Sequence, residues 1–141
     1  MEPLQFFFDD PQCRPYKKHH TDAGWDLRAA KEMHIPPGQT AMVPTGVSCI
    51  IPEGYVGIIK IRSSTGKMGL SNTSGVIDAD YRGQIQVLAQ NHGQNTVKLE
   101  IGQRFAQILV MPCLLDAELL PGKAPNDTDR GEGGFGSTGI K

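Results

Sequence analysis

The chain has 141 residues, which is enough for one domain with its own hydrophobic core. Its 14 Lys and Arg residues are balanced by 15 Asp and Glu residues, so it lacks the basic excess that sequence-independent binding to nucleic acid requires. The 3 cysteines are widely spaced and form no C-x-x-C pair, which argues against a disulfide framework or a zinc site and favours a reduced intracellular compartment, cytoplasmic or nuclear, over secretion.

The N-terminal segment contains one short apolar run, Phe6-Phe7-Phe8, which Asp9 and Asp10 end at once. Such a run is too short for a signal peptide or a membrane span, so no membrane partner is expected. Whether the first twenty residues pack on the core or bind a partner stays open at this stage.

Short β-branched runs follow, separated by Gly and Pro, and none has a sustained helical period. They predict strands over residues 41–51 with one break, and over 55–61, 84–88, 97–101 and 105–110. The loop 91–94 contains a Gly and predicts a hairpin between two of these strands. Only residues 64–70 could form a short helical turn. Many short strands at this spacing indicate an all-β sandwich or barrel, and we prefer a distorted jelly roll over residues 1–121.

Residues 122–141 differ from the rest of the chain, because they are rich in Gly and polar residues and poor in apolar ones. We expect them to form a mobile C-terminal arm. The run Gly134 to Gly139 matches G-x-G-x-x-G, but no predicted strand precedes it, so it is not a dinucleotide-binding fingerprint. The arm does suit phosphate, since glycines let backbone N–H groups approach an anion and Arg130 offers a forked cation. A plain disordered tail is the alternative.

Two further segments contain residues suited to phosphate chemistry. Arg62 lies where a predicted strand meets the possible helical turn, which is a favourable place for an anion. Asp78 precedes Tyr81 at a Gly-containing turn, where a carboxylate can act as general base on water. Asp80 and Arg82 beside them could form a local ion pair. Each segment also fits an ordinary polar loop or turn when taken alone.

Two more segments have weaker signals of their own. Asp26, in residues 22–27, is a hard oxygen ligand that suits Mg²⁺ held chiefly by substrate phosphates. Residues 102–107 include Gln107 and could be purely structural. In chain order, the candidate segments are AGWDL, RSSTG, GVIDADYRG, GQRFAQ and RGEGGFGSTG.

These five ordered segments, spanning residues 23–139, resemble the five motifs of the trimeric dUTPase family. One departure is Ile61, where the family usually has Pro before the motif's Arg; this concerns the stiffness of the loop and not the chemistry. The resemblance implies hydrolysis of dUTP to dUMP and pyrophosphate with Mg²⁺, which limits uracil incorporation into DNA and supplies dUMP for thymidylate synthesis. It also implies a homotrimer in which each site collects motifs from three subunits.

The resemblance assigns a role to each matching residue. Asp78 is the general base for the water that attacks the α-phosphorus, and Tyr81 packs on the deoxyribose and excludes a 2′-hydroxyl. The uracil is bound mainly by backbone groups of a hairpin that includes Asn72, Gly75, Val76, Ile77 and Gln86. Asp26 contacts the metal through water.

The remaining roles concern the triphosphate and the arm. The residues implied to bind phosphates in the core are Arg62, Ser63, Ser64 and Gln107. In the arm, Phe135 stacks over uracil, and the phosphate-binding residues are Arg130, Gly136, Ser137 and Thr138. The arm closes as a lid that excludes bulk water.

Three alternatives were weighed against this assignment. A dCTP deaminase shares the sandwich and the trimer but needs a catalytic Glu and lacks the closing arm. A catalytically idle binding or signalling protein on the same scaffold would be expected to have decayed motifs, and these are intact. A capsid-like jelly roll gives no reason for Arg130 and Phe135 in a mobile arm.

Overall fold

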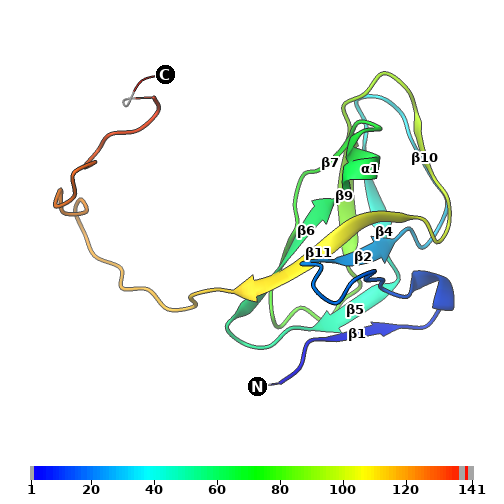
Figure 1. The fold of residues 1–141 in the computed structure, drawn as a ribbon, viewed down its shortest axis with the longest axis horizontal. Helices are drawn as coiled ribbons and strands as arrows, with labels where there is room; N and C mark the ends of the chain where they lie inside the picture. Colours follow the sequence, from blue (N-terminus) through cyan, green and yellow to red (C-terminus); the bar gives the residue numbers. More distant parts are fainter. Residues whose placement is uncertain (1, 137–138, 140–141) are drawn as a thin grey trace.

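The computed structural model describes residues 2–136 and 139 of the chain. Figure 1 shows a body of strands from which the C-terminal segment runs outward. The strands are β1 (Gln5–Phe8), β2 (Trp25–Arg28), β3 (Met33–Ile35), β4 (Thr40–Pro44), β5 (Val47–Ile50), β6 (Tyr55–Ile61), β7 (Leu70–Asn72), β8 (Val76–Ile77), β9 (Gln86–Asn91), β10 (Val97–Leu99) and β11 (Arg104–Pro112). The helical elements are a 3-10 turn, η1 (Pro11–Cys13), and one α-helical turn, α1 (Ser63–Gly66).

All strand pairings are antiparallel. They form a four-stranded sheet in the order β2-β11-β6-β8, a three-stranded sheet β4-β9-β7 and two ribbons, β1-β5 and β10-β3. The side chains between these layers make one core, whose largest fully buried members include Phe105, Leu27, Ile35, Ile59 and Ile108. The predicted all-β jelly-roll sandwich with one short helical turn is confirmed.

The break in the predicted strand 41–51 falls at Thr45 and Gly46. Gly46 has a φ of 68°, in the left-handed region that residues with a side chain rarely adopt. Beyond this turn the chain leaves the sheet of β4 and pairs with β1. The buried Thr45 hydroxyl donates to the carbonyl of Ile85 at 2.6 Å, which fixes the corner.

The predicted hairpin at residues 91–94 is wrong. β9 pairs with β4 and β7, whereas β10 pairs with β3, so the two strands flanking this loop are not partners. The reason is the buried side chain of Asn91, whose Nδ2 donates to the carbonyls of Ile35 and Asn95 at 2.8 Å each. These bonds attach the loop to the end of β3, and the chain then continues along that strand.

Five short strands, β1, β2, β3, β7 and β8, were not predicted from the sequence. None is longer than four residues, and each is stabilised mainly by its partner strand. β1 shows that part of the N-terminal segment packs on the body of the protein. It pairs with β5, and the ring of Phe6 packs edge-on against Trp25 with centroids 5.7 Å apart. Phe6 and Phe8 therefore pack against the core, whereas Gln5 and Phe7 are exposed.

The segment after β11 runs away from the body in Figure 1. Residues 114–132 are all exposed, including Leu114 and Leu119, which are 98% and 92% exposed. The exposed segment therefore begins just after β11, at residue 114, which is earlier than the start of the arm predicted at residue 122. Its first part contains the exposed leucines. Within the described residues, no helix is long and apolar enough to cross a membrane.

Candidate active site

A β-bulge in β11 builds the first part of the site. Arg104 pairs with Arg28 and Ala106 with Leu27, so the register shifts at the residue between them, Phe105. In a regular strand Arg104 and Gln107, three positions apart, would point to opposite faces of the sheet. The extra residue turns both onto the outer face, while Phe105 stays fully buried.

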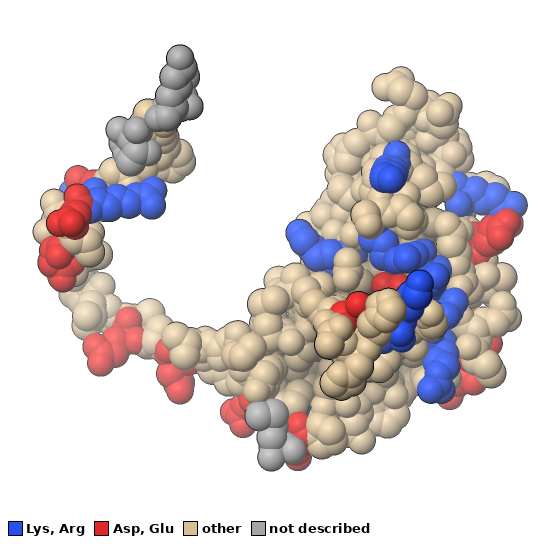
Figure 2. Space-filling view, viewed as in Figure 1, with Lys and Arg blue, Asp and Glu red and all other residues tan. Residues whose placement is uncertain are grey.

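The outer face of the four-stranded sheet therefore carries a row of polar side chains. Gln107 lies directly opposite Asp26 of β2 on one side and Lys60 of β6 on the other. Figure 2 shows Lys and Arg side chains gathered over β2 and β11 on the face it presents. Gly24 makes room for Gln107, because a methyl group on Gly24 would overlap the Oε1 atom of that glutamine.

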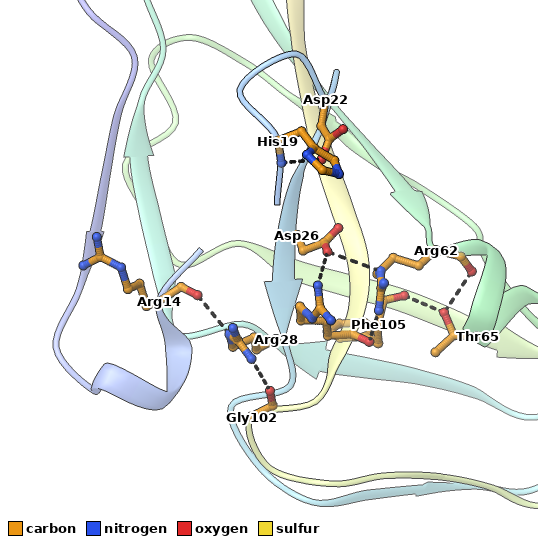
Figure 3. Close-up of polar contacts among 10 residues, drawn as sticks. Arg14, His19, Asp22, Asp26, Arg28, Arg62, Thr65, Gly102 and Phe105 are labelled. Atoms are coloured by element: carbon orange, nitrogen blue, oxygen red, sulfur yellow. Dashed lines mark hydrogen bonds and ion pairs between the residues drawn. The ribbon is translucent and has the colours of Figure 1, made fainter. Parts of the chain in front are cut away.

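Asp26 is the centre of a compact charge cluster (Figure 3). Its Oδ2 accepts a hydrogen bond from Nη1 of Arg104 at 3.1 Å and lies 3.4 Å from Nε of Arg62. Nη1 of Arg62 also donates to the carbonyl of Arg104 at 3.1 Å. The cluster is partly shielded, since the carboxylate is 18% exposed, so these pairs resist solvent screening better than surface pairs do.

The short helical turn α1 follows Arg62 and is anchored from below. Thr65 is buried, and its hydroxyl lies 2.7 Å from the carbonyl oxygen of Phe105 and 3.1 Å from that of Arg62. This anchoring leaves Ser63 and Ser64 exposed beside the Arg62 guanidinium. Arginine, two hydroxyls and the Gln107 amide together form a donor-rich surface suited to phosphate oxygens.

The segment from β7 through β8 builds the second part of the site. It is not the expected hairpin, because β7 pairs with β9 and β8 pairs with β6. The side-chain amide of Asn72 has three bonds within the chain: Nδ2 donates to the carbonyls of Ile59 (3.0 Å) and Ser74 (2.9 Å), and Oδ1 accepts from the N–H of Ile61 at 3.2 Å. Gly75 lies so close to β6 that a Cβ there would be 2.9 Å from the Ile59 oxygen. Val76, in contrast, is 67% exposed on β8, the edge strand of its sheet.

The turn after β8 presents Asp78 and Tyr81 to solvent. The N–H of Tyr81 donates to the carbonyl of Asp78 at 3.1 Å, and its hydroxyl donates to the carbonyl of Gln84 at 2.8 Å. The ring lies over Gly83, where a Cβ would be 2.5 Å from the hydroxyl oxygen. The turn therefore holds the tyrosine ring in one orientation.

The local ion pair that Asp80 and Arg82 could form is not present among the described residues. Arg82 instead turns its Nη1 to the carbonyl of Ala79 at 2.7 Å, inside the same turn. The guanidinium thereby caps the turn, and both carboxylates of the segment, Asp78 and Asp80, are left without an ion pair to a described residue.

The two parts of the site lie at opposite ends of β6. Ile77 pairs with Gly57, near the start of the strand, whereas Arg62 follows its last residue, Ile61. At about 3.3 Å per residue, the five to six residues between these positions separate Asp78 from Arg62 by roughly 20 Å. The single chain therefore does not bring the predicted base and the predicted phosphate-binding residues together.

Charge also distinguishes the two parts. Asp78 faces an open cavity of about 510 Å³ at the base of the C-terminal segment. The charged residues that line it are Glu2, Glu53, Asp78, Asp80 and Arg82. Four carboxylates against one cation cannot hold a triphosphate unaided, whereas the cluster around Arg62 has an excess of cations.

The predicted arm residues lie apart from both regions. Arg130 bonds within the arm, with Nε donating to the carbonyl of Gly133 at 2.6 Å, and Phe135 is fully exposed with a φ of 52°. Gly136 is exposed as well, and Ser137 and Thr138 lie outside the described residues. Gln86, predicted to lie in the hairpin region, is exposed at the first position of β9.

Two residues near the cluster were not singled out from the sequence. Arg104 was present in a recognised segment but received no role, and Tyr16 preceded all of them. The ring of Tyr16 lies under Arg104, with the guanidinium carbon 4.4 Å from its centroid. The only sequence signal for this contact is an aromatic residue shortly before the Asp26 segment. Such residues are too common to predict a contact between an aromatic ring and an arginine.

Comparisons with known proteins identify the family of the chain. A model of the dUTPase family matches residues 12–139. Among similar proteins, the deoxyuridine 5′-triphosphate nucleotidohydrolase of Cutibacterium acnes is 42% identical over 134 residues, covering 92% of this chain and 88% of that protein. The protein of the same name from Escherichia phage T5 is 41% identical over 140 residues, covering 93% and 95%.

Solved structures show the same fold. The Staphylococcus bacteriophage 80alpha dUTPase with dUpNHpp has a TM-score of 0.90 at 27% identity, covering 99% of this chain and 100% of that one. A dUTPase from phage phi11 of S. aureus, solved with a structural Mg(II) ion, has a TM-score of 0.78 at 24% identity, covering 88% and 100%, which shows the fold alone. The chain therefore belongs to the dUTPase family and hydrolyses dUTP to dUMP and pyrophosphate.

Proposed function

We propose that dUTP is hydrolysed in sites built between the subunits of a homotrimer, with Asp78 of one chain acting on a triphosphate held by Arg62 of another. The observation that carries this proposal is the separation of roughly 20 Å between the two residues along β6. A general base must come within hydrogen-bond reach of the water it deprotonates, beside the α-phosphorus. Only a second copy of the chain supplies both groups at that distance.

In this proposal the cluster around Asp26 holds the phosphates. Arg62, Ser63, Ser64 and Gln107 offer donors from one face of the sheet and from α1. Phosphoryl transfer depends on in-line positioning and on neutralising charge more than on covalent help. The arm then covers the substrate, with Arg130, Gly136, Ser137 and Thr138 on the phosphates and Phe135 on the base. Residues 1–121 form the core in this scheme, and 122–141 form the lid.

The segment from β7 through β8, with the turn that follows it, supplies selectivity for the nucleoside. Since the Asn72 amide has both donors engaged within the chain, uracil is bound by backbone groups at Gly75, Val76 and Ile77, with Gln86 at the border of the pocket. The Tyr81 ring, held by its bond to the Gln84 carbonyl, packs on the deoxyribose. A fixed ring leaves no space for a 2′-hydroxyl, and this excludes UTP.

Mg²⁺ is the metal that we propose for the reaction. Within the described residues, no group of three or more His, Cys, Asp or Glu side chains could hold an ion. This fits an ion that arrives with the triphosphate, since Mg²⁺ commonly binds one or two carboxylates together with phosphates and waters. Oδ2 of Asp26 is engaged by two arginines, so Oδ1 is the oxygen that would accept from a metal-bound water. The ion would neutralise phosphate charge.

Surface features of the single chain support self-association. Beyond Gln107, toward the end of β11, the outer face of the four-stranded sheet is apolar. It includes Val76, which is 67% exposed, and Met111, which is 42% exposed. The exposed leucines after β11 add a second uncovered apolar region. Contiguous apolar surface of this kind marks an interface. We also propose an intracellular location, because all three cysteines are free thiols.

Subunit complementation tests the shared site. Asp78→Asn and Arg62→Ala homotrimers should each lose most activity, whereas trimers re-formed from an equal mixture should recover about a quarter of the wild-type rate, because each site draws its two groups from two independently chosen chains. Re-forming each variant with itself is the control. If the mixture stays as inactive as its parents although exchange is shown by mass spectrometry, the shared site is refuted.

A further inference from the structure

We propose that Tyr16 is a positioning residue for the phosphate site, which it serves by holding Arg104 and, through Asp26, Arg62. The inference rests on the phosphate-binding role proposed for Arg62. It concerns a residue outside the five ordered segments, in the stretch between η1 and β2.

Tyr16 is joined to Asp26 through the backbone. The N–H of Tyr16 donates to the carbonyl of Asp26 at 3.0 Å, and the N–H of Asp26 donates to the carbonyl of Tyr16 at 2.7 Å. This isolated antiparallel bridge places the two residues side by side. The position of the Tyr16 ring is therefore fixed by the same strand that carries the carboxylate.

The ring of Tyr16 contacts two guanidinium groups. The guanidinium carbon of Arg104 lies 4.4 Å from the ring centroid and that of Arg28 lies 5.6 Å from it. Both distances are within the range in which a cation is attracted to an aromatic face. Arg28 is itself held at both ends, by the carbonyls of Arg14 and Gly102 at 3.0 Å each.

The cluster needs this uncharged support. Arg62 and Arg104 contact the single carboxylate of Asp26, and Arg28 lies against the same Tyr16 ring as Arg104, so repulsion among the three cations opposes their gathering. An aromatic face attracts a cation without adding an ion that a substrate phosphate would have to displace or repel. Tyr16 therefore offsets the repulsion and leaves the cluster electropositive.

Holding Arg104 fixes Arg62 in turn. Both guanidinium groups bind the same carboxylate oxygen, Oδ2 of Asp26, so the position of the Arg104 side chain affects where that oxygen meets Nε of Arg62. Nη1 of Arg62 donates to the backbone carbonyl of Arg104, and among the described residues its Nη2 has no partner. A guanidinium whose Nε and Nη1 are both engaged keeps its orientation, so Nη2 can donate to an anion with little further loss of rotamer freedom.

The test first compares three variants as intact enzyme. Tyr16→Leu, which removes the ring, should raise KM for dUTP about 2- to 30-fold with a smaller change in kcat, the range that a cation–π contact represents. Tyr16→Phe, which retains the ring, should restore KM. Arg14→Leu is the matched control, because its side chain contacts the ring of Phe8 at 5.7 Å and not the cluster. The affinity for pyrophosphate, measured by calorimetry, should fall with Tyr16→Leu in the same proportion.

Coupling to Arg62 decides the outcome. In an Arg62→Ala background, Tyr16→Leu should have no further effect on KM. If both single variants raise KM and their effects multiply in the double variant, Tyr16 acts elsewhere and the inference is overturned, while the role of Arg62 stands. If Arg62→Ala itself leaves KM unchanged, the proposed phosphate site fails and the inference fails with it.

Discussion

Asn72 offers a test of whether a side chain in the proposed uracil-binding segment, β7 through β8, binds the base or stabilises the segment itself. Its amide makes three bonds within the chain: two from Nδ2, to the carbonyls of Ile59 and Ser74, and one to Oδ1, from the N–H of Ile61. Asn72→Asp keeps the shape of the side chain but replaces both donors by a carboxylate oxygen. That oxygen would face two carbonyl oxygens.

The size of the effect follows from these bonds. Each lost hydrogen bond costs about 1 kcal/mol, and leaving the partners unsatisfied beside an anion adds more, so we expect a loss of about 2–4 kcal/mol. For a chain of this length, that corresponds to a fall in Tm of roughly 6–15 °C. Differential scanning calorimetry at fixed protein concentration measures it, and lowering the pH enough to protonate the introduced carboxyl should reduce the loss by restoring one donor.

Asn91→Asp provides a matched control. The buried Asn91 makes the same three kinds of bond, to Ile35, Asn95 and Gly93, but in a loop that belongs to neither part of the site. Both variants should lose stability, and only Asn72→Asp should also raise KM for dUTP, since it deforms the pocket. If Asn72→Asp kept the wild-type Tm while losing affinity for dUTP, the side chain would bind the base directly and the structural role would be refuted.

Three further changes test other parts of the molecule. Gly24→Ala should raise KM about tenfold with a normal Tm, because a methyl group would displace the Gln107 amide from the site, and an unchanged KM would contradict that contact. Leu114→Asp, at a 98% exposed position, should shift trimers toward monomers in light scattering, and an intact trimer would show that the leucine lies outside the interface. Burial raises the pKa of the Cys49 thiol, so at pH 8 iodoacetamide should modify the partly exposed Cys113 first. Cys49 should react only as the pH rises further. Equal rates of modification of the two cysteines, measured by mass spectrometry, would contradict the burial of Cys49.

The fold could be predicted where local pattern and tertiary pairing agree. The run of apolar residues over 55–61 predicted β6 at its observed bounds, Tyr55–Ile61. The two-residue strand β8 has no pattern of its own, since it exists because Val76 and Ile77 reach the edge of β6. The loop after β9 misled the prediction for the same reason: its Gly suggested a hairpin, but the buried amide of Asn91 determined its partner.

For the site, residue types were predictable and their distances were not. The ordered segments identified Arg62 and Asp78, but nothing in the sequence places them at opposite ends of one strand. The bulge at Phe105, which brings Arg104 and Gln107 to the same face, is likewise a property of the paired strands. Asp80 and Arg82 are close enough in sequence to pair, but Arg82 donates to a backbone carbonyl of its own turn instead.

The separation of the two parts has a chemical consequence for the base. Asp26 shows what happens to a carboxylate placed among the arginines: its Oδ2 is bound by Arg62 and Arg104 and is not available to a water. Asp78, at the other end of β6, has no ion pair to any described residue. In the proposed trimer, Asp78 of one chain faces Arg62 of another, and the triphosphate of the bound substrate lies between the base and the cations.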